Sequence, residues 1–312
     1  MNILVTGGAG FIGSHIVEAL QADHNVVIID NINDYYNPEF KKENLALLRP
    51  EKFYQVDVTD STALTEIFKD HKFDLIIHLA ARAGVRSSLL EPDLYAKVNL
   101  LGTTNLAKLA MEYNVNRFIF GSTSAVYGDT TTVPFSEDVN VNEPISPYAA
   151  TKRAAELMLY TNHHLHNIQT TILRFFTVYG ERGRPDMAPY LFTEKILKEK
   201  EIIKFGDGNT SRDYTYIADI VQGVKAAVEN PFPYEIINLG NNEPISLNDF
   251  IATVEKVTGK TAIIKQVGMQ PGDVHQTYAN IDKAKKLLNF KPTTSLEEGL
   301  NKFASWYQNN RI

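Results

Sequence analysis

The feature that most constrains this sequence is a glycine-rich turn between a short apolar run and a helical pattern. The run Asn2–Thr6 leads into Gly7, and Gly10 and Gly13 follow at three-residue spacing as the helix pattern Phe11–Ala22 begins. Glycines at this spacing allow a tight turn, a close approach of the backbone to a pyrophosphate, and close helix–strand packing. The N-terminus of the helix then faces the phosphates. The turn therefore predicts a βαβ unit that binds a dinucleotide.

An acidic residue at the end of the second predicted strand indicates which dinucleotide. Asp30 stands seventeen residues beyond Gly13. A carboxylate there accepts hydrogen bonds from the ribose 2′-hydroxyl and repels a 2′-phosphate. The following residues, Asn31, Ile32 and Asn33, include no arginine or lysine to hold that phosphate. We therefore expect NAD as the cofactor rather than NADP.

The first half of the chain alternates short β-branched runs with longer helical patterns, which predicts an α/β fold with a Rossmann-type, doubly wound parallel sheet. Strands are predicted at Asn2–Thr6, Asn25–Asp30, Lys52–Gln55, Leu75–Leu79, Arg117–Ser122 and Gln169–Phe176, and helices at Phe11–Ala22, Ser61–Asp70, Asp93–Tyr113 and Pro147–His164.

A change of composition after Tyr179 predicts a second, smaller lobe. Residues 180–213 are rich in Gly, Pro, Arg and Asp, after which a helix pattern (Ile217–Glu229) and a strand pattern (Glu235–Leu239) resume. We predict an NAD-binding Rossmann domain over residues 1–178, to which 214–240 return. Residues 179–213 and 241–312 would form a C-terminal substrate-binding lobe. Two of its helices begin with capping-box spacings, Ser246…Asp249 and Ser295…Glu298.

Composition excludes several classes of protein and site. The net charge of −6 argues against a nucleic-acid partner. Cysteine is absent, which removes disulfide scaffolds, thiolate zinc sites and thiol nucleophiles. The histidines His163, His164 and His166 have no neighbouring carboxylates, so we interpret them as a solvated helix end and predict no metal site. The absence of a signal peptide and of any apolar stretch of about 18–20 residues predicts a soluble, cytoplasmic protein without a membrane partner.

A tyrosine and a lysine four residues apart carry the predicted chemistry. Tyr148 and Lys152 share one face of a helix. A free phenol, with a pKa of about 10, is a poor base at neutral pH. A nearby ammonium and a nicotinamide would favour the phenolate. Such a pair is common on helix surfaces, but here it follows the hydroxyl cluster Ser122–Ser124 and a dinucleotide turn.

Together these motifs resemble the extended branch of the short-chain dehydrogenase/reductase superfamily, and the likeness covers essentially the whole chain. It is carried by Gly7–Gly13, His78–Ala81, Asn99, Ser122–Ser124 and Tyr148–Lys152. The resemblance implies that Tyr148, Lys152 and Thr123 are catalytic. It implies cofactor contacts by Gly7, Gly10, Phe11, Ile12, Gly13, Asp30, Asn31, Asp57, Val58, Leu79, Ala80, Ala81, Asn99, Tyr148 and Lys152.

The residues after Thr123, the predicted catalytic hydroxyl residue, favour one reaction of this superfamily. Relatives that dehydrate or decarboxylate sugars carry acidic residues there, whereas this chain has Ser124 and Ala125. An elimination needs a general acid for the leaving hydroxyl, and neither residue supplies one. The resemblance therefore favours epimerisation, in which a hydride leaves the sugar, the 4-keto intermediate rotates, and the hydride returns.

Stretches of the second half resemble nucleotide-sugar epimerases, and most closely the UDP-glucuronate 4-epimerases. They are Arg174–Gly180, Gly183–Ala188 and Gly206–Tyr214. The resemblance implies epimerisation of UDP-glucuronate to UDP-galacturonate and a homodimer formed through Asp93–Tyr113 and Pro147–His164. The expected substrate contacts are Arg86, Thr123, Ser124, Thr177, Arg184, Arg212 and Asp273.

Among these residues, Arg212 and, more weakly, Arg86 would hold the diphosphate, and Asp273 the uridine ribose. Arg184 would hold the uronate carboxylate, with Arg182 as the alternative. Three other functions remain open: a UDP-glucose 4-epimerase, a UDP-glucuronate decarboxylase, and a non-catalytic nucleotide-sugar sensor. UDP-glucose 4-epimerases usually carry Asn where Thr177 stands.

Overall fold

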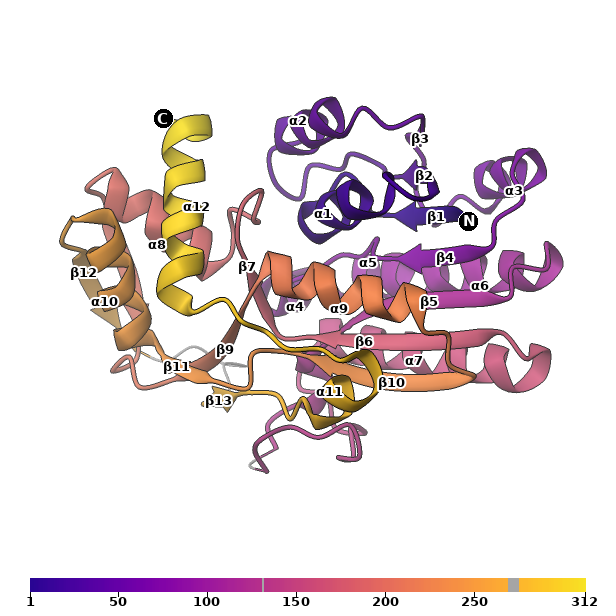
Figure 1. The fold of residues 1–312 in the computed structure, drawn as a ribbon. Coiled ribbons are helices and arrows are strands. Elements are labelled where there is room, and N and C mark those ends of the chain that lie inside the picture. The colour runs from indigo at the N-terminus through magenta and orange to yellow at the C-terminus, as the bar shows by residue number, and fades with distance from the viewer. Residues whose placement is uncertain (131, 269–274) are drawn as a thin grey trace.

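The computed structural model describes residues 1–130, 132–268 and 275–312, and its centre is a 7-stranded sheet (Figure 1). The strand order is β10-β6-β5-β4-β1-β2-β3, and every neighbouring pair is parallel. The predicted doubly wound parallel sheet is confirmed. Its strands are β1 (Asn2–Thr6), β2 (Asn25–Ile29), β3 (Lys52–Tyr54), β4 (Leu75–His78), β5 (Arg117–Thr123), β6 (Gln169–Phe175) and β10 (Tyr234–Leu239).

Helices cover both faces of this sheet because successive residues of each strand point to opposite sides. In β1, Ile3 and Val5 belong to one buried cluster and Leu4 to another, and all three are fully buried. In Figure 1, helices of the first cluster lie in front of the sheet, and helices of the second cluster lie behind it. The front helices are α1 (Phe11–Leu20) and α9 (Ile217–Glu229), and the second cluster includes α3 (Ser61–Asp70), α6 (Gly102–Glu112) and α7 (Pro147–His166).

The order of the strands indicates where a binding crevice is expected. The chain runs outward from β1 to β2 and β3, and then in the other direction from β4 to β5 and β6. In such sheets a crevice opens outside the carboxyl ends of the strands where the direction reverses. The glycine turn after β1 and the hydroxyl residues at the end of β5 therefore meet at one edge.

Most of the chain after β6 forms the smaller lobe, which Figure 1 shows beside one end of the sheet. Its strands are β7 (Thr177–Tyr179), β8 (Glu201–Phe205), β9 (Ser211–Tyr216), β11 (Pro244–Ser246), β12 (Ile263–Val267) and β13 (Gln276–Thr277), and its helices include α8 (Ala188–Leu197), α10 (Leu247–Thr258) and α12 (Leu296–Arg311). Helix α11 (Asp282–Leu288) packs instead against β10 and α9 of the large sheet. The chain returns to the large sheet at β10, which pairs with β6. The exact division into a cofactor domain and a substrate lobe stays a prediction.

Both predicted capping boxes supply the expected hydroxyl caps. Ser246 Oγ accepts a hydrogen bond from the Asp249 backbone N–H at 3.0 Å, and Ser295 Oγ accepts one from Glu298 at 3.2 Å. The histidines of the His163 group lie in the last turn of α7, as predicted. None of the helices in the described ranges is long and apolar enough to cross a membrane.

Two helical regions differ from the sequence prediction. The single helix expected over Asp93–Tyr113 is divided into α5 (Pro92–Tyr95), a π-helical turn η1 (Ala96–Leu101) and α6. Helices α2 (Glu39–Leu48) and α4 (Val85–Leu90) were not predicted. In α2 two of the three buried residues, Lys41 and Asn44, are polar, so the sequence lacks the apolar periodicity of an ordinary surface helix.

Candidate active site

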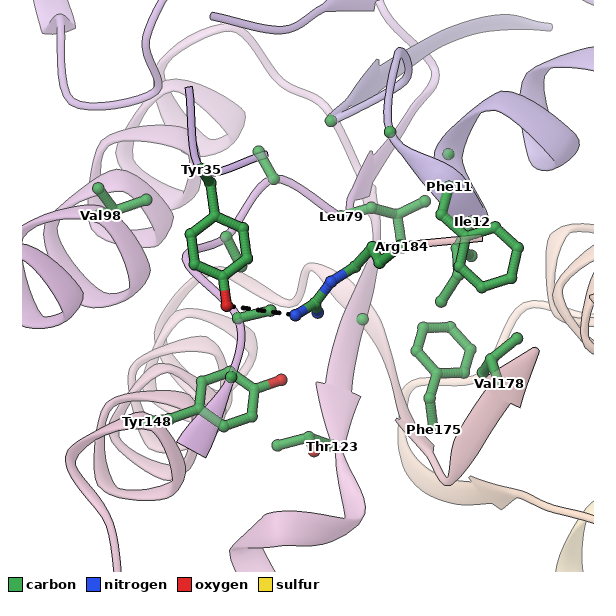
Figure 2. A pocket seen from close by; sticks show the side chains of 18 of the residues that line it. Phe11, Ile12, Tyr35, Leu79, Val98, Thr123, Tyr148, Phe175, Val178 and Arg184 are labelled. Carbon is green, nitrogen blue, oxygen red and sulfur yellow. Dashed lines mark hydrogen bonds between the residues drawn. The ribbon is translucent and has the colours of Figure 1, made fainter. Parts of the chain in front are cut away.

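A cavity of about 710 Å³ lies at the carboxyl edge of the sheet and extends from the glycine turn to Tyr148 (Figure 2). Most of the predicted site residues line it: Gly7, Gly10, Phe11, Ile12, Gly13, Asp30, Asn31, Asp57, Val58, Leu79, Ala80, Ala81, Arg86, Thr123, Ser124, Tyr148, Lys152, Thr177 and Arg184. The fold therefore brings residues from the carboxyl ends of β1 to β5, from helix α7 and from the 180–187 loop to one cavity.

The glycine turn has the geometry that a bound pyrophosphate requires. Gly7 has φ +72°, and a Cβ on it would lie 2.7 Å from the Ala80 backbone nitrogen. A Cβ on Gly13 would lie 2.1 Å from the Gly7 carbonyl oxygen. Gly10 precedes α1 without a side-chain cap, so the first N–H groups of this helix face the cavity uncapped. The turn thus fits the diphosphate of a dinucleotide.

The acidic residue after β2 has a partner that the sequence did not reveal. Asp30 is buried, and its Oδ1 accepts hydrogen bonds from the Ile32 backbone N–H at 2.9 Å and from Lys41 Nζ at 3.2 Å. Lys41 also donates to Asn33 Oδ1 at 3.3 Å. Lys41 comes from α2, the unpredicted helix, and no local motif marks it. The carboxylate that would hold the ribose diol is therefore oriented by a buried lysine.

A second carboxylate ties the neighbouring loops together. Asp57 accepts hydrogen bonds from Asn31 Nδ2 at 2.7 Å and from the Thr59 backbone N–H at 2.8 Å and hydroxyl at 2.7 Å. Burial pushes the pKa of Asp57 upward, but these hydrogen bonds from Thr59 and Asn31 outweigh burial and lower the pKa below its usual value. Asp57, one of the predicted cofactor contacts, is thus held ionised at the cavity wall.

Tyr148 and Thr123 meet at the reactive end of the cavity (Figure 2). The Thr123 hydroxyl oxygen accepts a hydrogen bond from the Ala125 backbone N–H at 3.2 Å, so its own hydrogen remains to be donated elsewhere. Burial raises the pKa of Tyr148 above its usual value, and the Thr123 side chain and the Arg184 guanidinium offset only part of this rise. Two groups are therefore placed to stabilise a phenolate at Tyr148.

Lys152 is almost completely buried, 2% exposed, one turn after Tyr148. Its ammonium lies 3.9 Å from the centre of the Phe120 ring. Burial lowers the pKa of Lys152 to about 7, and the charge of Glu156 acts in the opposite direction. In this structure the ammonium therefore titrates near neutral pH.

A buried ionic network, not predicted from the sequence, joins helix α7, which carries Tyr148 and Lys152, to strands β5 and β6. Glu156 accepts hydrogen bonds from Ser122 Oγ at 2.6 Å, from Arg174 Nε at 3.0 Å and Nη2 at 2.8 Å, and from Arg153 at 3.0 Å. Burial raises the pKa of Glu156, but hydrogen bonding to Arg174 outweighs it and keeps the pKa below its usual value. The network fixes the residue before Thr123 against the helix that carries Tyr148.

Asn99 does not line the cavity, although we expected it among the cofactor contacts. It lies in the π-helical turn η1, accepts a hydrogen bond from the Arg82 backbone N–H at 2.8 Å, and donates to the Arg82 carbonyl at 3.0 Å and the Thr151 hydroxyl at 3.1 Å. It therefore joins the loop after β4 to helix α7, next to Tyr148 and Lys152.

Arg184 points into the cavity toward Tyr35, Tyr148 and Thr123 (Figure 2). It forms an ion pair with Asp186 and donates to the Tyr35 hydroxyl at 3.3 Å. The alternative, Arg182, does not line the cavity and instead contacts Glu18 and His15 of α1. Of the two arginines, Arg184 alone is placed to meet a substrate.

Of the three residues expected to contact the diphosphate and the uridine ribose, only Arg86 is among the described residues that line the cavity. Arg86 lines the cavity with its guanidinium 4.7 Å from the centre of the Phe205 ring. Arg212 lies in β9, donates to the Ser211 carbonyl at 2.8 Å, and is not among the described residues that line the cavity. Asp273 lies outside the described residues. In the described ranges, no group of three His, Asp or Glu side chains has a metal-binding arrangement.

Comparison with known proteins identifies the family. A family model described as the NAD dependent epimerase/dehydratase family matches residues 3–240. The chain belongs to this family. The protein is NAD-dependent, in agreement with the sequence prediction.

Relatives match this chain over nearly its full length. A UDP-glucuronate 4-epimerase of Thermodesulfobacterium geofontis is 46% identical, over 98% of this chain and 96% of the relative. The crystal structure of a Bacillus cereus UDP-glucuronic acid 4-epimerase with UDP-glucuronic acid and NAD is 37% identical, with a TM-score of 0.92 and 99% of each chain covered. A Thermotoga maritima UDP-glucose 4-epimerase with UDP-glucose is 33% identical, with a TM-score of 0.93 and full coverage of both chains.

Proposed function

We propose that this protein is an NAD-dependent UDP-glucuronate 4-epimerase, which interconverts UDP-glucuronate and UDP-galacturonate. The observation that carries the proposal is an arginine, Arg184, in the same cavity as Tyr148 and Thr123. An arginine is the side chain best suited to hold a carboxylate, because its donors match the two oxygens. The similarity to the Thermodesulfobacterium and Bacillus enzymes supports the same substrate.

The proton chemistry falls to Tyr148 and Thr123. The chemistry supplied by NAD is reversible acceptance of the hydride from C4, which leaves a 4-keto sugar that turns before the hydride returns. Tyr148, as phenolate, takes the proton of the 4-hydroxyl and later returns it to the same oxygen, O4, once the sugar has turned. Thr123 bridges this transfer, since its hydroxyl hydrogen is not used by the protein backbone. Lys152 contributes positive charge beside the reacting oxygen and the ribose.

Arg184 has a second task in this proposal. The 4-keto form of a glucuronate is a β-keto acid, which loses CO2 when its C5–C6 bond aligns with the carbonyl π system. A guanidinium that holds the carboxylate out of that alignment protects the intermediate. Among the residues that the structure describes, the carboxylates that line the cavity do not supply a free general acid, because Asp30, Asp57 and Asp186 are bound by Lys41, Asn31 and Arg184. Decarboxylation and dehydration are therefore disfavoured.

The anchoring contacts for the UDP group remain part of the proposal. Arg212 and Arg86 would hold the diphosphate, and Asp273 the uridine ribose. Ser124 and Thr177 would face the sugar, since both line the cavity.

Replacing Arg184 with methionine tests the proposal, because methionine keeps the length of the side chain and removes the charge. We expect the KM for UDP-glucuronate to rise at least tenfold while the KM for UDP-glucose changes less than threefold. The control is Arg182→Met, which removes an arginine outside the cavity and should leave the ratio of the two KM values unchanged. An Arg184 variant with unchanged uronate preference would contradict the assignment.

UDP-glucose 4-epimerase is the second candidate, and one observation favours it. Asp186 neutralises Arg184, so the cavity does not carry an uncompensated positive charge at this point. The similarity to the Thermotoga enzyme agrees with a neutral sugar. A non-catalytic sensor is disfavoured because a binding module does not need Tyr148, Lys152 and Thr123 together.

The proposal includes a homodimer in the cytoplasm. Exposed apolar side chains gather on η1 and α7, the helices expected at the interface: Leu101, Leu157, Met158, Tyr160 and Leu165. Light scattering after size exclusion should give about 70 kDa, twice the 35.0 kDa of one chain. Leu157→Glu should shift this mass toward the monomer, since a charge on a buried apolar interface is costly.

A further inference from the structure

Arg184, the proposed carboxylate ligand, already holds a carboxylate of its own chain. Its Nε donates to Asp186 Oδ1 at 3.0 Å, and its Nη2 donates to Asp186 Oδ2. This is the two-pronged contact that a guanidinium makes with any carboxylate. Both residues lie in the loop between β7 and α8, two positions apart, and both line the cavity.

Tyr35 keeps this ion pair in place from the other side of the cavity (Figure 2). Its hydroxyl accepts a hydrogen bond from Arg184 Nη2 at 3.3 Å and donates to Asp186 Oδ2 at 3.2 Å. Two guanidinium groups lie near the ring, with Arg82 at 4.9 Å and Arg184 at 5.3 Å from its centre. A Cβ on Gly84 would come within 2.5 Å of the hydroxyl, so glycine is needed to admit it.

The ion pair changes what an arriving substrate meets. A uronate carboxylate must either take the place of Asp186 on Arg184 or share the guanidinium with a second negative charge. Displacing Asp186 costs binding free energy because the ion pair with Arg184 is lost. Sharing the guanidinium costs binding free energy because the two carboxylates repel each other. A neutral sugar meets neither cost. The Asp186 side chain is 38% exposed, so it can turn toward water when it is displaced.

We propose that Asp186 is an internal competitor for Arg184 that weakens uronate binding and sets how strongly the site prefers UDP-glucuronate over UDP-glucose. This inference rests on the proposed role of Arg184 as the carboxylate ligand. It assigns to Asp186 a specificity-determining role and no part in proton transfer. Tyr35 positions the competing pair.

The test is the binding of UDP-glucuronate, UDP-glucose and UDP to the NAD-loaded protein, measured by titration calorimetry. All variants carry Tyr148→Phe so that turnover does not disturb the titration. Asp186→Asn keeps the shape and removes the charge, and Asp186→Ser provides a second variant without the carboxylate. The matched control is Asp34→Asn, which changes net charge equally at an exposed residue of the neighbouring loop.

We expect Asp186→Asn and Asp186→Ser to bind UDP-glucuronate about tenfold more tightly, and UDP-glucose and UDP within twofold of the parent. Asp34→Asn should change every affinity less than twofold. Unchanged or weaker uronate binding in both Asp186 variants would overturn the inference, provided that Arg184→Met still loses the preference for the uronate. If Arg184→Met keeps that preference, the carboxylate-binding role of Arg184 fails, and the inference fails with it.

Discussion

Replacing Lys152 with methionine should stabilise the folded protein while it abolishes turnover. Burial lowers the pKa of Lys152 from 10.5 to about 7. At about 1.4 kcal/mol per pKa unit, the buried ammonium opposes folding by about 4 kcal/mol at pH 7. The contact of the ammonium with the Phe120 ring stabilises the folded protein by about 1 kcal/mol, and methionine lacks this contact. We therefore expect a net gain of about 3 kcal/mol in the free energy of unfolding.

The pH dependence of this gain follows from the direction of the shift. Between pH 7 and 10.5 the unfolded chain binds more protons at Lys152 than the folded chain does, so wild-type stability rises with pH in this window. Methionine has no such dependence. The stability difference between variant and wild type should therefore shrink as the pH rises from 7 toward 10.

Urea unfolding of the nucleotide-free proteins at pH 7, 8 and 9, followed by circular dichroism, measures the difference. Lys286→Met, at an exposed lysine, serves as the control and should change stability by less than about 0.5 kcal/mol. The reasoning is refuted if Lys152→Met is less stable than wild type at pH 7, or if its advantage does not vary with pH.

Three further predictions concern neighbouring residues. Tyr148→Phe should lower kcat by about 10²–10⁴-fold with NAD affinity within threefold of wild type, and a variant that keeps more than about a tenth of the wild-type rate would exclude Tyr148 as the base. Asp30→Ser should improve NADP binding about tenfold in titrations, because Lys41 then meets the 2′-phosphate, and adding Lys41→Leu should remove the gain. Glu156→Gln should destabilise the protein by about 3 kcal/mol in urea unfolding, since it leaves Arg174 buried beside a neutral partner, and a loss below about 1 kcal/mol would contradict this.

The parts of the site that the sequence predicts are those whose spacing is set by a single local element. Gly7, Gly10 and Gly13 act within one turn, and Tyr148 and Lys152 within one helix, so their relation is visible in the sequence alone. The parallel sheet is predictable for the same reason, since each strand is a short, strongly apolar run.

The residues that the sequence did not reveal are those that partner across the fold. Lys41 reaches Asp30 from a helix whose buried face is polar, and Tyr35 reaches Arg184 from a loop 149 residues away. Asp186 is two residues from Arg184, yet nothing in that spacing shows that the two side chains form an ion pair with each other. Such contacts depend on the packed structure, and no periodicity or motif encodes them.

The central claim is tested most directly by incubating the purified protein with UDP-glucuronate and, separately, with UDP-glucose, and identifying the products by proton NMR. The account predicts UDP-galacturonate from the first substrate, formed faster than any galactose epimer from the second, with no release of CO2. A pentose product, epimerisation of the neutral sugar alone, or two unchanged substrates would contradict it.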